Sequence, residues 1–319
     1  EGPLRRLLDL IIDGKHIAID VNKNPLMEYH MLIIPEPEKN LPQIFVAEAL
    51  NAMFAVRKLS KSGRLKIGFN AWGGAASVNN LHLQAAYYQE PVAIERAGRS
   101  RVQAISGIET GVVGDDYPSK MVSFTVQDSE KFRNVFLSYV DFLRDNHIVY
   151  PISMFGGFIY IWPQELNADQ DQFMFARGTM EMDGHAYVYN ADQYDQITRE
   201  DIEHQMKISN IDEQRFDQIF LELDRIIQDS AQIADQFAAN EGGVDFKQIQ
   251  FYNSEPIVLV REINKEEMKI SSGKIKYENG KYVEEIIIKA NTPGICVEKN
   301  DKEVIMVSFD EGDTKYLPF

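Results

Sequence analysis

The order of hydrophobic and polar positions divides the first part of the chain into short strands and helices. Residues 15–21 (KHIAIDV) alternate as a half-buried strand does, and 30–35 and 65–70 are short apolar strands. Residues 42–60 repeat apolar side chains at helical spacing, with Pro42 at a suitable first helical position. This part of the chain is therefore predicted to mix β and α elements.

The middle of the chain continues this mixture. Strands are predicted over 81–88 and 121–126, and a helix over about 129–145. The segment 148–164 places two adjacent glycines, at 156 and 157, between two apolar runs. That arrangement is typical of a β-hairpin with a tight turn.

The pattern changes towards the C-terminus. Two helices with polar faces are predicted over about 198–208 and 212–239, and Gly242 and Gly243 follow the second. From 245 to 319, short strand-like segments alternate with Asn-Gly, Thr-Pro-Gly and Glu-Gly-Asp turns. This spacing predicts a small SH3-like β-barrel after an α+β region.

Composition excludes several classes of protein. The chain has 319 residues, 33 basic and 49 acidic, with a net charge of −16. This balance argues against nucleic-acid binding and against a polybasic membrane patch. No apolar run approaches the roughly 20 residues of a membrane span, and the first residues lack the apolar core of a signal peptide. We therefore expect a soluble cytoplasmic protein.

The single cysteine, Cys296, excludes an internal disulfide framework and any multi-cysteine zinc site. No other cluster with metal-ligand spacing is evident, so neither a metal nor a cofactor is expected.

One segment, 68–91, carries candidate chemistry. A loop of small residues (AWGGAAS) leads into a strand on which Asn80, His82 and Gln84 alternate, so their side chains are predicted to share one face. Gly74 and its small neighbours would let backbone N–H groups approach a phosphate. His82 could attack phosphorus, and Gln84 could donate a hydrogen bond to a phosphoryl oxygen. The alternative interpretation is a strand with a satisfied histidine and two solvent-facing amides.

Four segments, in order, resemble the histidine-triad superfamily in its galactose-1-phosphate uridylyltransferase branch. They are NKNPLMEYHMLIIP with LPQ (22–43), GFN through NNLHLQAAYY to ER (68–96), the hairpin ending IYIWPQ (159–164), and EMDGH with EQRF (181–216). Within that branch the sequence is most similar to the GDP-hexose phosphorylases, which act on GDP-L-galactose or GDP-D-glucose. The resemblance covers about residues 15–225. It implies a domain over 1–240, built from two halves of antiparallel sheet and helices at about 1–115 and 116–240. The barrel predicted at 245–319 is not part of the family pattern.

The resemblance also implies a reaction and a set of site residues. His82 stands at the position of the family nucleophile, Gln84 at that of the amide that steadies the phosphoryl oxygens, and Asn80 at that of an orienting histidine. The expected substrates are a nucleotide-sugar or a dinucleotide, together with inorganic phosphate, and a homodimer is a possible assembly. Further substrate-binding residues implied by the matching segments are Asn22, Asn70, Gly74, Ser77, Asn79, Arg96, Glu181 and His185.

Two positions depart from the family pattern. Asn80 replaces the first histidine of the signature, and Pro151 replaces an asparagine of the second half. His30 is interpreted as a buried structural histidine. Besides a GDP-hexose phosphorylase, two interpretations therefore stay open: a dinucleoside-tetraphosphate phosphorylase with the same nucleophile, and a nucleotide-binding protein that has lost catalysis.

Overall fold

The computed structural model describes most of the chain, namely residues 6–114, 116–166, 177–188 and 190–239, and shorter stretches beyond them at 250–252, 257–263, 274–278, 281–289, 292–299, 305–309 and 316–318. The chain divides into two compact units, Glu1–Ala234 and Asp235–Phe319. The larger unit contains every residue of the candidate site.

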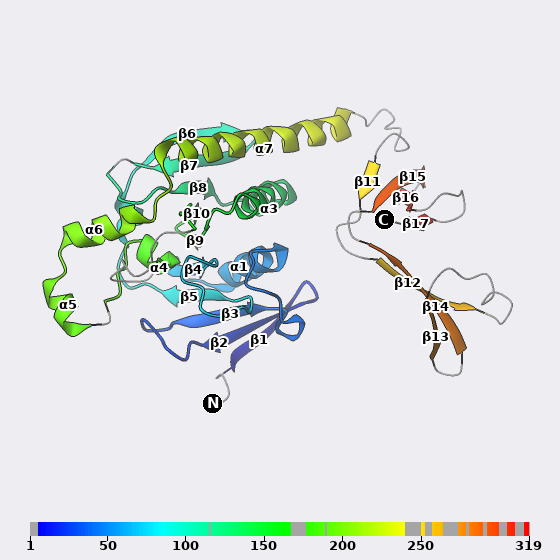
Figure 1. The fold of residues 1–319 in the computed structure, drawn as a ribbon, viewed down its shortest axis with the longest axis horizontal. Coiled ribbons are helices and arrows are strands. Elements are labelled where there is room, and N and C mark those ends of the chain that lie inside the picture. Colours follow the sequence, from blue (N-terminus) through cyan, green and yellow to red (C-terminus); the bar gives the residue numbers. More distant parts are fainter. Residues whose placement is uncertain are drawn as a thin grey trace. The chain divides into compact units, whose positions relative to one another are not determined.

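A ten-stranded antiparallel sheet forms the centre of the larger unit (Figure 1). Its strand order is β1-β2-β3-β5-β4-β9-β10-β8-β7-β6. The strands are β1 (Arg6–Ile12), β2 (Lys15–Val21), β3 (Met31–Pro35), β4 (Leu65–Phe69), β5 (Leu83–Tyr87), β6 (Arg99–Ile105), β7 (Ile108–Val113), β8 (Val122–Thr125), β9 (Ile152–Phe155) and β10 (Phe158–Ile161). The sheet and its helices confirm the predicted α+β class.

The two predicted halves meet in the middle of this sheet. Strand β4 pairs antiparallel with β9, and Gly68 lies opposite Ser153 in that register. The expected pair of sheets is therefore one continuous sheet, joined at β4–β9 and again where β7, of the first predicted half, pairs with β8. The hairpin β6–β7, which the hydrophobic pattern did not predict, pairs with β8 and extends the sheet at its far edge.

The helices are α1 (Ala47–Leu59), α2 (Ala93–Arg96), α3 (Glu130–Asp145), α4 (Thr179–Met182), α5 (Ala191–Gln196), α6 (Arg199–Ile208) and α7 (Glu213–Ala239), with a 3-10 turn η1 (Pro37–Lys39). Helix α3 illustrates how the sequence forms them. The Ser129 side chain accepts the Phe132 N–H at its start, and buried residues recur at helical spacing from Phe132 to Leu143.

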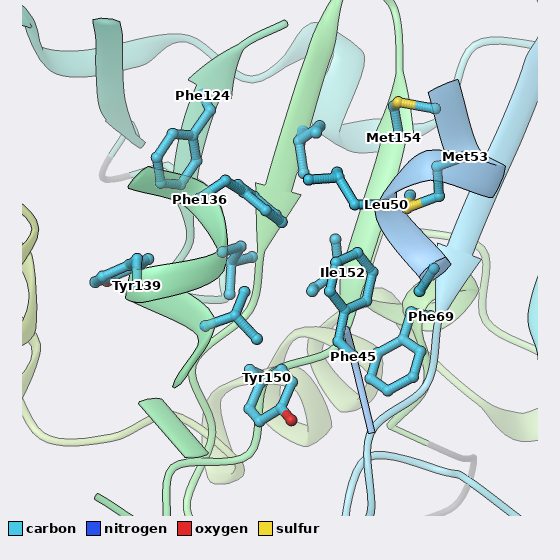
Figure 2. Close-up of a cluster of buried hydrophobic side chains, with 14 of the residues drawn as sticks. Phe45, Leu50, Met53, Phe69, Phe124, Phe136, Tyr139, Tyr150, Ile152 and Met154 are labelled. Carbon is cyan, nitrogen blue, oxygen red and sulfur yellow. The ribbon is translucent and has the colours of Figure 1, made fainter. Parts of the chain in front are cut away.

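Side chains of α1, α3 and α7 share one apolar core with the sheet. Figure 2 shows its centre, where Phe45 lies close to Phe69 and Phe124 packs with Phe136. The ring centroids of each of these pairs are 5.2 Å apart in an edge-to-face arrangement. The helices thus cover one face of the sheet and leave the other to shorter segments, α4 among them.

The start of α1 differs from the prediction. The helix begins at Ala47 and not at Pro42. Residues 42–44 form a tight turn in which the Ile44 N–H donates to the Pro42 carbonyl at 2.7 Å. The backbone is extended at Val46, the residue before α1, so the helix does not continue back to Pro42, and Gln43 is left to hold the candidate site, as described below.

The smaller unit contains two antiparallel sheets in its described parts. One has the order β11-β15-β16-β17 and the other β12-β14-β13. The strands are β11 (Gln250–Tyr252), β12 (Ile257–Ile263), β13 (Lys274–Glu278), β14 (Lys281–Ile288), β15 (Pro293–Lys299), β16 (Ile305–Ser308) and β17 (Tyr316–Pro318). Short strands were expected here, and a closed SH3-like barrel stays a prediction.

Candidate active site

The candidate site lies where the loop between β4 and β5 returns to the sheet, and Gln43 holds both ends of that loop. Its side-chain Nε2 donates to the carbonyl oxygens of Asn70 at 3.0 Å and of His82 at 3.1 Å, while its Oε1 accepts the His82 N–H at 2.9 Å. Its main-chain N–H donates to Asn79 Oδ1 at 3.0 Å. Gln43 is 1% exposed, so this clasp is shielded from water. Sequence reasoning did not single it out.

The ring of His82 has a defined protonation state. Its Nδ1 lies 2.8 Å from the main-chain oxygen of Asn80. Because a carbonyl oxygen only accepts, Nδ1 must carry the proton, which leaves the lone pair on Nε2. Burial lowers the pKa of His82 and so favours the neutral ring. In the part of the chain that the structure describes, Nε2 has no hydrogen-bond partner. This is the arrangement that a nucleophilic imidazole requires.

A row of polar side chains crosses three neighbouring strands beside His82. Asn22 follows β2, His30 precedes β3 and Gln84 lies on β5, and the antiparallel pairings β2–β3 and β3–β5 bring them to one face. His30 Nε2 is 2.6 Å from Gln84 Oε1, and Asn22 Nδ2 donates to the same oxygen at 3.2 Å. His30 is 4% exposed. As expected it is buried, but it also contacts the site.

This row opens into a cavity of about 400 Å³. Of the predicted site residues it brings together Asn22, Asn70, Ser77, Gln84 and Glu181, and its remaining lining residues are Asn24, Leu26, His30, Ala75 and Met180. The lining contains amides, a hydroxyl, an imidazole and a carboxyl but neither lysine nor arginine. Such a cavity can bind a polar ligand through neutral donors, with charge neutralised only by fixed dipoles.

Glu181 comes to the cavity on the short helix α4, which packs on β4 and β9. Gly68 makes this packing possible, since a Cβ there would overlap Thr179 Oγ1 and lie 3.0 Å from Thr179 Cβ. The Thr179 N–H donates to Asn70 Oδ1 at 3.0 Å, which ties the helix to the β4–β5 loop. Burial raises the pKa of Glu181 to about 7. Glu181 therefore faces the cavity as a carboxyl that changes charge near neutral pH.

A buried lysine and a second carboxyl lie beside α4. Lys66 Nζ is 2.9 Å from Glu95 Oε2 and lies over the Phe155 ring. Burial raises the pKa of Asp183, and Lys66 opposes that shift. Lys66 belongs to β4, as Gly68 does, so this strand places a positive charge near the end of α4.

Several predicted residues lie outside the cavity lining, and His82, the predicted nucleophile, is one of them. Gly74 packs against Pro151, and a Cβ at Gly74 would lie 2.7 Å from Pro151 Cγ. The small size of this residue therefore serves a close approach between the loop and the start of β9. Asn79 Oδ1 accepts the main-chain N–H of Gln43. Asn80 is exposed.

Arg96 and His185 lie apart from the row as well. Arg96 lines a different cavity, of about 420 Å³, between α2 and α6. The His185 ring stacks on Tyr187 with centroids 5.3 Å apart and meets Tyr88 edge-on. The structure does not bring either residue into contact with the Gln84 cavity, so their expected roles stay predictions.

The part of the chain that the structure describes shows neither a cluster of metal ligands nor a membrane-spanning helix. Within the described residues, no group of three or more histidine, cysteine, aspartate or glutamate side chains could hold a metal ion. Among the helices that the structure describes, none combines the length and apolar character needed to cross a bilayer.

The chain matches two family models that follow one another along the sequence. GDPGP1-like, N-terminal domain, matches residues 9–86, and GDPGP1-like, C-terminal domain, matches residues 104–229. Together they cover more than half of the chain and contain all of the cavity-lining residues.

Curated proteins with similar sequences carry related names. GDP-D-glucose phosphorylase 1 of Danio rerio is 26% identical over 204 residues, which are 58% of this chain and 59% of that protein. The Homo sapiens protein of the same name is 40% identical over 81 residues, or 25% of this chain and 21% of its own. GDP-L-galactose phosphorylase 1 of Arabidopsis thaliana is 22% identical over 217 residues, which are 63% of this chain and 48% of that protein. Each match thus spans less than two thirds of the relative's length.

Among solved structures, the yeast Ap4A phosphorylase Apa2 has a TM-score of 0.49 at 14% sequence identity. The superposition covers 63% of this chain and 74% of that one. At this TM-score and identity, the likeness does not identify site residues in this chain.

Proposed function

Because the chain belongs to the GDPGP1-like family, we propose that it is a nucleotidyl-transferring phosphorylase that cleaves a GDP-hexose with inorganic phosphate. The observation that carries the proposal is the ring of His82, whose Nδ1–H is held by the Asn80 carbonyl so that the lone pair lies on Nε2. A histidine fixed in this tautomer, two residues before the Gln84 that lines the cavity, is suited to attack phosphorus.

The reaction has two displacements at one phosphorus atom. His82 Nε2 attacks the α-phosphorus, the P–N bond forms, and the P–O bond to hexose 1-phosphate breaks. An oxygen of inorganic phosphate then attacks the same phosphorus, the P–N bond breaks and GDP leaves. After the first attack the ring carries a positive charge, which the Asn80 carbonyl stabilises through Nδ1–H.

The cavity supplies donors for the phosphoryl oxygens and for the substrate. The resemblance assigns Gln84 to these oxygens and Asn70 and Ser77 to the loop along the nucleotide phosphates, and all three line the cavity. Asn22 and Glu181 are proposed to bind the remainder of the substrate. Glu181 can approach a phosphate or a sugar hydroxyl without full negative charge, since burial raises its pKa to about 7.

A trapped covalent intermediate tests the proposal. Incubation with GDP-glucose, GDP-L-galactose or GDP-mannose, without phosphate, should add one guanylyl group to the chain by mass spectrometry. Addition of phosphate should remove that group and release GDP. His82→Ala should form no adduct, whereas His147→Ala, at a turn remote in sequence from the site, should behave as the wild type.

Two outcomes would replace the proposal. An adenylyl adduct from diadenosine tetraphosphate, with no guanylyl adduct, would favour a dinucleoside-tetraphosphate phosphorylase. Nucleotide binding with no adduct from any donor, even in Asn80→His, would indicate a protein that binds without catalysis. A homodimer and a cytoplasmic location stay predictions, which sedimentation and fractionation would test.

A further inference from the structure

The protons in the row Asn22–His30–Gln84 can be assigned from its contacts. The main-chain N–H of Leu26 donates to His30 Nδ1 at 3.0 Å. Because Nδ1 accepts this bond, it carries no proton, and the neutral ring must carry its proton on Nε2. Burial lowers the pKa of His30, which favours this neutral form. His30 Nε2–H therefore donates to Gln84 Oε1, 2.6 Å away. Asn22 Nδ2 is also 3.2 Å from His30 Nε2, but a protonated nitrogen accepts no hydrogen bond, so Asn22 Nδ2 donates to Gln84 Oε1.

This assignment also fixes the direction of the Gln84 amide. Its oxygen accepts from His30 and from Asn22 Nδ2. An amide turned by 180° would place its NH₂ group against these two donors, so that orientation is excluded. The amide nitrogen has no hydrogen-bond partner among the described residues, and Gln84 lines the cavity. The NH₂ group is therefore the part of Gln84 that remains for a ligand.

We propose that His30 is a positioning residue for the transfer reaction, holding the Gln84 amide with its NH₂ group available to the transferred phosphoryl group. This inference rests on the proposed function. A donor that is already oriented costs no reorganisation when charge develops on the phosphoryl oxygens, whereas an amide oxygen there would repel them. His30 and His82 thus have opposite tautomers with separate tasks, since one orients a donor and the other presents a lone pair.

A double-mutant cycle separates this role from a structural one. His30→Ala should slow guanylyl transfer to His82 by about 10- to 100-fold, because the Gln84 amide can then turn. Gln84→Ala should slow it by at least as much. In the Gln84→Ala background, adding His30→Ala should change the rate by less than about twofold, since no amide remains to be oriented. An equal loss from His30→Ala in both backgrounds would overturn the proposal.

The variants also need a check on folding. Near- and far-UV circular dichroism of each single variant should match the wild type. If His30→Ala fails to fold, His30→Phe, which keeps a planar ring but has no donor for Gln84 Oε1, replaces it in the cycle. A slowed rate for His30→Phe that Gln84→Ala does not mask would count against the positioning role.

Nitrogen-15 NMR of the full chain tests the geometry without substrate, and so distinguishes failure of this inference from failure of the proposed function. At pH 7.5 His30 should show protonated Nε2 and unprotonated Nδ1, and His82 the reverse. The His30→Ala and His82→Ala spectra assign the two rings. Both rings in the same tautomer, or a protonated Nδ1 on His30, would overturn the inference whether or not any donor reacts.

Discussion

The Nδ1 atom of His82 lies 2.8 Å from the main-chain oxygen of Asn80. The residue that departs from the family signature thus orients the proposed nucleophile through its backbone and not through its side chain. The Asn80 side chain is exposed. An asparagine can therefore stand at this position without loss of the contact that sets the tautomer of His82.

The first prediction concerns that position. Asn80→Ala and Asn80→His should each change the rate of guanylyl transfer by less than about tenfold, because the orienting carbonyl is retained, whereas loss of an orienting contact costs on the order of 100-fold. The measurement is single-turnover adduct formation with a GDP-hexose. A rate increase of about 100-fold or more in Asn80→His would mean that the missing imidazole is itself required.

A second prediction concerns the clasp at Gln43. Gln43→Leu should lower the free energy of unfolding by about 2–4 kcal/mol, since it leaves the N–H of His82 and two buried carbonyls without partners. It should also slow adduct formation, because the ends of the β4–β5 loop are released. Urea unfolding measures the stability and single-turnover kinetics the rate.

The matched control for the clasp is Gln43→Glu. A carboxylate can accept the His82 N–H but cannot donate to the carbonyls of Asn70 and His82. It should therefore lose stability as well. Wild-type stability in both variants would contradict a role for Gln43 in holding the loop.

The sequence predicts the α+β class and several elements because local patterns carry them. The apolar spacing in α3 and the Gly156–Gly157 turn are properties of neighbouring residues. The period of two also predicts that His82 and Gln84 share one face, but β5 begins at Leu83 and of the two only Gln84 lines the cavity, so the shared face stays a prediction. The resemblance adds an ordered set of motifs, which the two family-model matches confirm.

What the sequence could not predict depends on contacts between distant residues. Gln43 reaches Asn70 and His82 across 27 and 39 positions, and no local pattern indicates such a clasp. The early start expected for α1 was wrong because the chain turns at 42–44 and is extended at Val46, and in this conformation Gln43 reaches the β4–β5 loop. The role of His30 needed the register of β3 with β5, since burial alone fits any core histidine.

A third prediction concerns the close approach of α4 to β4. Gly68→Ala should lower the free energy of unfolding by about 1–3 kcal/mol, because the new Cβ would overlap Thr179 Oγ1. The displaced helix should also weaken substrate binding by moving Glu181. Gly63→Ala is the control, since a Cβ there meets no atom within 4 Å. Equal stability of the two variants would contradict the packing of α4 on Gly68.

The last prediction follows from the carboxyl of Glu181. Its pKa is raised from the usual 4.5 to about 7 by burial, so the folded state binds a proton that the unfolded state has released. Stability from this group is therefore fully present below pH 4.5 and is lost as pH rises towards 7. The substitution Glu181→Gln puts an uncharged amide in place of the carboxyl and so removes this loss.

Urea unfolding of wild type and Glu181→Gln at pH 4.5, 5.5, 6.5 and 7.5 measures the effect. The free energy of unfolding of the variant, relative to that of the wild type, should rise steadily between pH 4.5 and 7 by a total on the order of 3 kcal/mol. Above pH 7 the difference between the two should stay constant. The charge of Glu181 is one cause of the raised pKa of Asp183, so the same comparison made in the Asp183→Asn background separates the two carboxyls. A pH-independent difference would show that the Glu181 carboxyl titrates in the folded chain as it does in the unfolded one, and that the cavity does not hold it protonated.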